Sequence, residues 1–178
     1  MIKTTNLIIN KVSHRHADAL FRIYGDVENN AYNPSPPFPS IEYSQSVLNT
    51  WIEHWRVKGI GNHAISKISN EDCIIGFGGF SFKKFRGKEV VSLGYKFTPD
   101  VWGNGYATEF VNGIIEHTTL PGNVIEVIAR THPENIASIR VLEKAGFIYL
   151  EIYDDNDGMG LSAVFSRKDH RQTSGAAR

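Results

Sequence analysis

Apolar residues in the first third of the chain change from strand spacing to helix spacing. Residues 6–12 carry a short apolar run that predicts a strand. Over residues 17–24 the apolar side chains recur every three or four positions, which predicts a helix capped by Ser13. The proline-rich segment 33–39 cannot continue a helix, and a second helix is predicted over residues 40–59. A strand followed by two helices therefore opens the chain.

The rest of the chain returns to strand spacing and then alternates. Three apolar segments joined by short polar connections favour antiparallel hairpins. The pattern then predicts a helix, a strand, a second helix and a final hairpin. The predicted order is β-αα-βββ-α-β-α-ββ, an α/β fold with a mixed, mostly antiparallel sheet. In this part the strands are expected at 63–68, 74–82, 90–97, 124–129, 147–153 and 161–165, and the helices at 107–115 and 139–145.

Composition indicates one globular core. The chain has 178 residues, of which 41% are hydrophobic and 21% charged, so it is expected to bury a core and not to be disordered. We expect a domain over residues 1–168 and a polar tail over residues 169–178.

Charge and apolar run length exclude several classes of protein. Lys plus Arg and Asp plus Glu both number 19, so bulk charge cannot hold nucleic acid, and an anionic ligand must be met by local donors. No segment approaches about 18 uninterrupted apolar residues, and because polar residues interrupt the first apolar run we do not expect residues 1–14 to form a signal sequence. We therefore expect a cytoplasmic protein with neither a nucleic-acid nor a membrane partner.

Metal-binding signals are weak. The single cysteine, Cys73, excludes an internal disulfide and a cysteine-cluster zinc site, and we expect it to be a small core residue. His14 and His16 alternate without further ligands nearby, which is typical of solvated side chains. No metal is expected.

A glycine-rich turn between a predicted strand and a predicted helix carries the strongest chemical signal. Gly103 and Gly105 permit positive φ and let a ligand approach the backbone, and the amides there lie at the positive end of a helix dipole. Such a turn is suited to a phosphate or diphosphate, although a simple tight connection has the same sequence. A dinucleotide fold would need glycine where Thr108 stands, and a nucleoside-triphosphate loop would need a Gly-Lys-Ser/Thr ending.

Two further segments allow a structural and a functional interpretation. Asn135 is placed to cap a helix with Ser138 in its first turn, and capping alone explains either residue taken singly. Gly76, Gly78 and Gly79 resemble a phosphate loop, but no helix follows them, so a closely packed strand is favoured.

Together these segments resemble the GNAT superfamily of acyl-CoA-dependent N-acetyltransferases, in the branch typified by the ribosomal-protein N-terminal acetyltransferases RimJ and RimL. The resemblance spans roughly residues 3–168 and rests on the motifs at 93–95, 102–109, 133–138 and 141–147. It implies a single-domain fold with helices on both faces of the sheet. It also implies acetyl-CoA as co-substrate, with pantetheine lying between two parted strands. The cofactor contacts it implies are Phe97, Thr98, Trp102, Gly103, Asn104, Gly105, Tyr106, Ala107, Thr108, Asn135 and Ser138.

The resemblance also implies direct transfer, in which a neutral amine attacks the thioester in a ternary complex. Many relatives carry a tyrosine acid where Leu142 stands, which leaves Ser138 as the nearest donor, and Tyr95 is the second catalytic candidate. Branch members often carry an acidic residue at the position of Ser92. The identity of the general base is therefore left open, and the candidates are ordered water, Tyr95 and a carboxylate such as Glu53.

The acceptor side is less defined. Phe38, Trp51 and Trp55 are candidate substrate-binding residues because the second helix and the proline-rich loop flank the acceptor in relatives, although packing of the helix on the sheet is the first interpretation of the two tryptophans. The acceptor is expected to be a peptide N-terminus or a small amine. A non-catalytic acyl-CoA sensor is the rival interpretation, a dinucleotide oxidoreductase a distant third, and a homodimer is left open.

Overall fold

The computed structural model describes residues 1–122, 124, 126–154 and 160–168, so the predicted tail at 169–178 lies outside the described residues. Eight strands form one sheet in the order β1-β2-β3-β4-β5-β6-β8-β7. The strands are β1 (Ile2–Lys3), β2 (Leu7–Lys11), β3 (Asn62–Lys67), β4 (Asn70–Phe85), β5 (Lys88–Phe97), β6 (Glu126–Thr131), β7 (Ile148–Asp154) and β8 (Leu161–Lys168). The helices are α1 (Ala17–Tyr24), α2 (Ile41–Lys58), α3 (Tyr106–His117) and α4 (Ile136–Lys144), with 3-10 turns η1 (His14–His16), η2 (Glu28–Asn30) and η3 (Pro99–Val101).

The predicted α/β class and element order are confirmed, with the short strand β1 and the three 3-10 turns as additions. The strands β3, β4 and β5 form the two predicted antiparallel hairpins. The pairing of β5 with β6 is parallel, because α3 crosses over between them, and every other pairing in the sheet is antiparallel.

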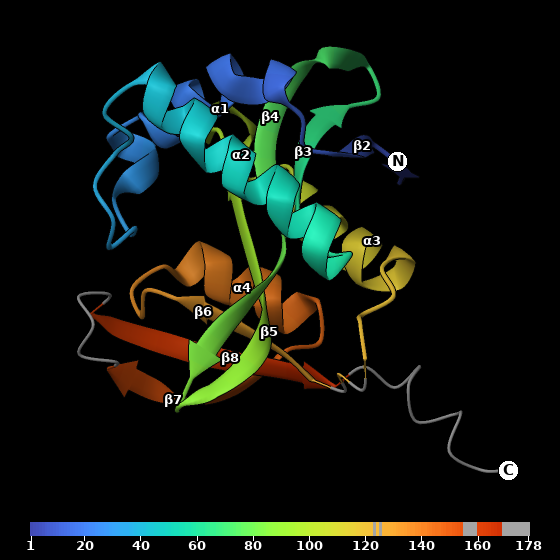
Figure 1. Cartoon of the computed structure of the whole chain (residues 1–178). Coiled ribbons are helices and arrows are strands. Elements are labelled where there is room, and N and C mark those ends of the chain that lie inside the picture. Colours follow the sequence, from blue (N-terminus) through green and yellow to red (C-terminus); the bar gives the residue numbers. More distant parts are fainter. Residues whose placement is uncertain (123, 125, 155–159, 169–178) are drawn as a thin grey trace, which may run out of the picture.

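Helices cover both faces of the sheet. On one face α1 and α2 pack through Leu20, Ile23 and Leu48 against β4 Phe77. On the other face α3 and α4 contribute to a larger core that includes Phe110. The long strands β4 and β5 run from the part of the sheet under α1 and α2 to the part that holds β6, β8, β7 and α4 (Figure 1). Strand β4 contributes to both cores, through Phe77 on the α1 and α2 face and Phe80 on the other, whereas the core residues of β5 belong to the larger one.

Local sequence signals explain the helix ends. The Ser40 side chain accepts a hydrogen bond from the Tyr43 N–H at 3.2 Å and begins α2, and Gly59 ends the helix in the left-handed conformation. Ser13 instead precedes the 3-10 turn η1, and α1 begins after His16, so the predicted cap lies one turn before the α-helix.

The prediction for the glycine-rich strand is confirmed, and the prediction for Cys73 is not. A Cβ built on Gly79 would lie 2.0 Å from the Gly61 carbonyl oxygen, so close packing in β4 explains this glycine and the predicted strand is confirmed. The prediction that Cys73 is a core residue is wrong, because the first residues of β4 extend beyond the covered part of the sheet and Cys73 is exposed.

Among the described residues, no helix is both long and apolar enough to cross a membrane. Within the described ranges, no cluster of three or more His, Cys, Asp or Glu side chains could hold a metal ion.

His63 is a buried titratable group. It is 4% exposed, its ring lies edge-on to Trp55 with the centroids 4.9 Å apart, and its Nδ1 has no hydrogen-bond partner within the described chain. Burial lowers the pKa of His63 from 6.5 to about 4, and the charge of Lys11 adds to the effect. The unfolded chain therefore binds a proton at this residue between pH 6.5 and 4, and the folded chain does not.

We predict that the free energy of unfolding falls as the pH is lowered from 7 to 5, and that His63→Leu removes about 2 kcal/mol of this fall. The sign follows from a folded-state pKa below the unfolded one, since lowering the pH then stabilises the unfolded chain. Urea denaturation at the two pH values measures the difference. The exposed His14 supplies a control, and the prediction fails if His14→Leu flattens the pH dependence as much as His63→Leu.

Candidate active site

Strands β5 and β6 part in the middle of the sheet. Their parallel pairing covers only Val91–Leu93 of β5 against Val127–Ala129 of β6. Beyond Leu93, β5 stays paired with β4 as far as Phe97, and β6 stays paired with β8 as far as Thr131. Both strands therefore continue beyond the last residues that pair them with each other, and a gap opens between their carboxyl-terminal halves.

The backbone of β5 presents donors to this gap. The Thr98 N–H donates to the Ile75 carbonyl oxygen of β4 at 2.9 Å. Because backbone groups alternate in direction along a strand, the N–H groups of Tyr95 and Phe97 point to the opposite edge, where β6 has diverged. The Phe97 side chain is buried in the core and the Thr98 hydroxyl also bonds Ile75, so of these two predicted contacts only the Phe97 backbone donor faces the gap.

The amino-terminal end of α3 carries unpaired amides beside the gap. The backbone N–H groups of residues 103–108 have no hydrogen-bond acceptor within the described residues. Gly103 and Gly105 have φ of 77° and 80°, and a Cβ on either would meet nothing within 4 Å. An unobstructed row of donors at the positive end of a helix dipole fits a diphosphate.

Side chains hold this turn in shape. The Asn104 side-chain amide donates to the carbonyl oxygens of Val101 and Trp102, at 3.0 and 3.1 Å. The Trp102 indole N–H donates to the Phe97 carbonyl oxygen at 3.0 Å, while the side chain remains 53% exposed. Glu109 fixes the first turn of α3 to the amino-terminal segment by accepting hydrogen bonds from Thr4, the Asn6 backbone and the Asn6 side chain. The unpaired amides are therefore held in place by neighbouring side chains.

The start of α4 lies against the same part of β5. Asn135 caps the helix by accepting a hydrogen bond from the Ser138 N–H at 3.1 Å, as predicted. The Tyr95 hydroxyl lies 3.5 Å from the Ser138 carbonyl oxygen and donates toward it. The Ser138 hydroxyl has no partner among the described residues, so it is free to donate to a ligand.

Tyr95 is buried enough to change its acid–base behaviour. Burial raises the pKa of Tyr95 to about 12, and its contact with Ser138 offsets this only in part. The phenol is therefore protonated at neutral pH and can donate a hydrogen bond, but it cannot accept a proton as a general base.

The three predicted substrate-binding residues all pack against the core on the α1 and α2 face, but with different partners. The Tyr24 ring contacts those of Phe38 and Trp51, with centroids 5.0 and 5.9 Å away. The Trp55 indole N–H instead donates to the Asn62 carbonyl oxygen at 2.6 Å, next to His63. Phe38 and Trp51 therefore share a contact with Tyr24, whereas Trp55 contacts β3.

Sequence reasoning missed a charged residue beside the gap. Lys96 of β5 points to the face covered by α1, where its Nζ lies 2.5 Å from Asn30 Oδ1 and 4.5 Å from the Tyr24 ring centroid. Burial lowers the pKa of Lys96 from 10.5 to about 8, and Asp26 opposes the shift. The available signal was a lysine in an otherwise apolar strand segment directly before the glycine-rich turn.

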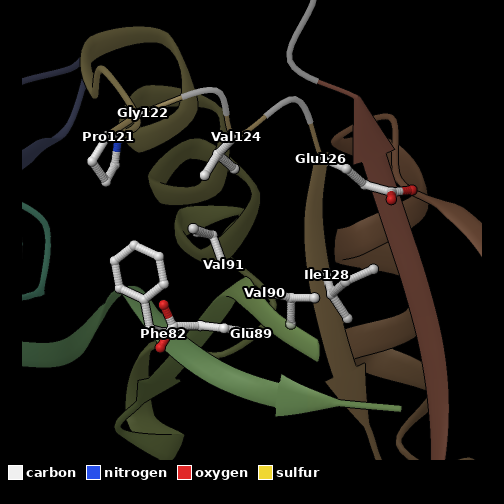
Figure 2. Close-up of a pocket in the computed structure, with 9 residues that line it drawn as sticks. All are labelled: Phe82, Glu89, Val90, Val91, Pro121, Gly122, Val124, Glu126 and Ile128. Carbon is white, nitrogen blue, oxygen red and sulfur yellow. The ribbon is translucent and has the colours of Figure 1, made fainter. Parts of the chain in front are cut away.

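A separate hollow of about 400 Å³ lies at the other end of the parallel pair, where β5 and β6 begin (Figure 2). Its lining includes Phe82, Glu89, Pro121 and Ile128. None of the predicted site residues lines it, so it is distinct from the gap between the strands.

Comparison with known proteins identifies the family. The model of the Acetyltransferase (GNAT) domain matches residues 6–148. The uncharacterized N-acetyltransferase YnaD of Bacillus subtilis (strain 168) is 29% identical over 148 residues, which cover 82% of this chain and 81% of YnaD.

Solved structures share the fold. The ribosomal-protein-S5-alanine acetyltransferase of Vibrio fischeri matches with a TM-score of 0.77 at 16% identity, over 94% of this chain and 96% of that one. The spermidine N-acetyltransferase of Vibrio cholerae, solved with CoA and spermine, matches with a TM-score of 0.75 at 11% identity, over 96% and 99% of the two chains. With the family match over residues 6–148, these findings show that the chain belongs to the GNAT family and is an acyl-CoA-dependent N-acetyltransferase.

Proposed function

We propose that this acetyltransferase moves the acetyl group of acetyl-CoA to a primary amine, with a protein or peptide N-terminus as the leading acceptor, as in the RimJ/RimL branch. The observation that carries the cofactor site is the row of unpaired amides at residues 103–108 next to the parted strands. A neighbour that acts on a ribosomal protein supports the leading acceptor, and a neighbour solved with spermine makes small amines the second class.

The cofactor site uses main-chain donors. The amides of residues 103–108 bind the diphosphate, and the pantetheine arm lies between β5 and β6. The Phe97 N–H points into the gap and donates to the thioester oxygen as charge develops there. Asn135, at the start of α4, is the predicted contact for the pantetheine arm on the other side of the gap.

Ser138 is the predicted donor to the leaving sulfur. Acetyl-CoA, when bound, supplies a thioester carbonyl that a neutral amine attacks, with the CoA thiolate as leaving group. The Ser138 hydroxyl is unpaired, and the backbone of Ser138 is held by Asn135 on one side and by Tyr95 on the other. Tyr95 is therefore a positioning residue for Ser138, and its buried, protonated phenol suits this task.

Of the three groups considered as general base, ordered water is the one we propose for the proton of the acceptor amine. Tyr95 stays protonated, and Glu53 is paired with Arg56 at 2.5 Å on the exposed surface of α2. Neither group is therefore available as a general base in the gap. Co-binding of the two substrates supplies much of the rate enhancement.

Thiol release from acetyl-CoA across an amine panel tests the function. We expect release with at least one primary amine, and a higher kcat/KM for a peptide with a free N-terminus than for spermidine. A higher kcat/KM for spermidine would move the assignment to the small-amine class. Tight acetyl-CoA binding without release for any amine would contradict acetyl transfer and favour the sensor.

Gly105→Val should weaken CoA binding at least tenfold, because a branched side chain would occupy the space that the diphosphate approaches. Calorimetric titration with CoA measures the effect. Gly87→Val is a matched control, because Gly87 also has a positive φ, of 73°, and open surroundings but lies in the β4–β5 turn. An equal loss of affinity in the two variants would show that backbone strain, and not the cradle, accounts for the result.

Ser138→Ala should lower kcat about tenfold to a hundredfold and change the CoA dissociation constant by less than twofold, because the lost hydroxyl has no structural partner. Steady-state kinetics together with CoA titration separate the two effects. If affinity and turnover fall by the same factor, Ser138 is a binding residue and not the donor to the sulfur.

A further inference from the structure

Lys96 places a positive charge on the acceptor face of the parted strand. It lies in the segment of β5 that has lost its pairing with β6, between Tyr95 and Phe97. Neighbouring side chains of a strand point to opposite faces, so Tyr95 points toward α4 and Lys96 points toward α1. The two residues therefore flank the same gap from its two sides.

The ammonium of Lys96 is held rigidly but is not neutralised. Asn30 is 7% exposed, and its side-chain nitrogen donates to the Tyr24 and Asp26 carbonyl oxygens, which fixes its oxygen toward Lys96. Lys96 forms no ion pair with any carboxylate of the described residues. An ammonium has three donors, and Asn30 takes one of them.

Residues 25–39, the loop between α1 and α2, border this side of the gap. The loop reaches β5 through the contact of Asn30 with Lys96. It reaches the segment after β6 through Tyr32, whose ring centroid lies 5.5 Å from that of His132. An acceptor that enters beside this loop would meet Lys96 next to Phe97, whose N–H is the proposed donor to the thioester oxygen.

A half-buried cation without a carboxylate partner favours an incoming anion and opposes an incoming cation. Asp26 is the acidic group whose charge acts on Lys96, and it lies in the exposed part of the loop. A protonated polyamine would bring a second positive charge to this position, whereas an amine with a nearby carboxylate would bring the missing counter-charge.

We propose that Lys96 determines acceptor specificity and selects amines that carry an anionic group within a few bonds of the amino group. This inference rests on the proposed function, because it assumes that the acceptor binds on the α1 side of the gap. Acidic peptide N-termini and free amino acids share this chemistry. Polyamines and polycationic small molecules are disfavoured by the same charge.

Binding of acetylated products tests the inference without requiring catalysis. Calorimetry on the full chain with CoA compares N-acetyl-Ser-Asp-amide with N-acetyl-Ser-Asn-amide for the peptide class, and N-acetylglycine with N-acetylglycinamide for the amino-acid class. In at least one pair, we expect the acid to bind about tenfold more tightly than the matched amide. The pair that shows the preference identifies the source of the anionic group.

Variants separate the charge of Lys96 from its contact with Asn30. Lys96→Gln can still donate to Asn30 but has no charge, so it should bring the ratio between acid and amide close to one. Lys96→Arg keeps the charge and should keep a preference of several fold. Lys88→Gln removes an exposed lysine at the start of β5 and should leave the ratio unchanged.

Three results would overturn the inference: equal or undetectable binding of acid and amide in both pairs, an unchanged ratio in Lys96→Gln, or the same loss of preference in Lys88→Gln. A wild-type chain that shows the preference but releases no thiol with any amine would count against the proposed function and not against the selectivity. Circular dichroism of each variant confirms that the fold is retained.

Discussion

The end of hydrogen bonding between β5 and β6 is the constraint on which the site depends. A parallel pair normally continues until one strand ends, and here both strands continue with other partners. The backbone groups of β5 that would have bonded β6 are left facing a gap, and they need a polar partner. An extended ligand with its own amide groups meets that need, which is how parted strands in the middle of a sheet become a binding site.

The remaining site elements are arranged around that gap. The η3 turn and α3 follow directly from the end of β5, so the unpaired amides lie at its mouth. The crossover through α3 returns the chain as β6 on the other side of the gap, and α4 then places Ser138 over Tyr95. In the proposed function, one β-α-β-α segment therefore supplies the cofactor cradle, the opening and the donor to the leaving group. The proposed acceptor side comes from the separate, earlier part of the chain that holds α1, the loop and α2.

Much of this could be predicted from the sequence because it depends on local signals. Short segments of sequence determine the helix caps at Ser40 and Asn135, the glycine turn at 103 and 105, and the spacing of the hairpins. What could not be predicted depends on contacts between distant segments. The contact of Lys96 with Asn30 and the different partners of Trp55 and Phe38 depend on the twist of the sheet and the path of the loop. Cys73 illustrates the same limit, because the spacing of apolar residues does not show where a strand extends beyond the covered part of the sheet.

The cradle at the start of α3 has a further consequence for how such a protein diverges. Its donors are main-chain groups, so exchanging the side chain at 104, 106, 107 or 108 removes no donor. The two glycines, with their positive φ, and Asn104, whose side-chain amide donates to the carbonyl oxygens of Val101 and Trp102, are tied to the geometry. In the proposed function, recognition of the diphosphate therefore depends little on the side chains at 106, 107 and 108, and the acceptor half can accumulate substitutions and acquire new amines while the chemistry of the shared co-substrate stays intact.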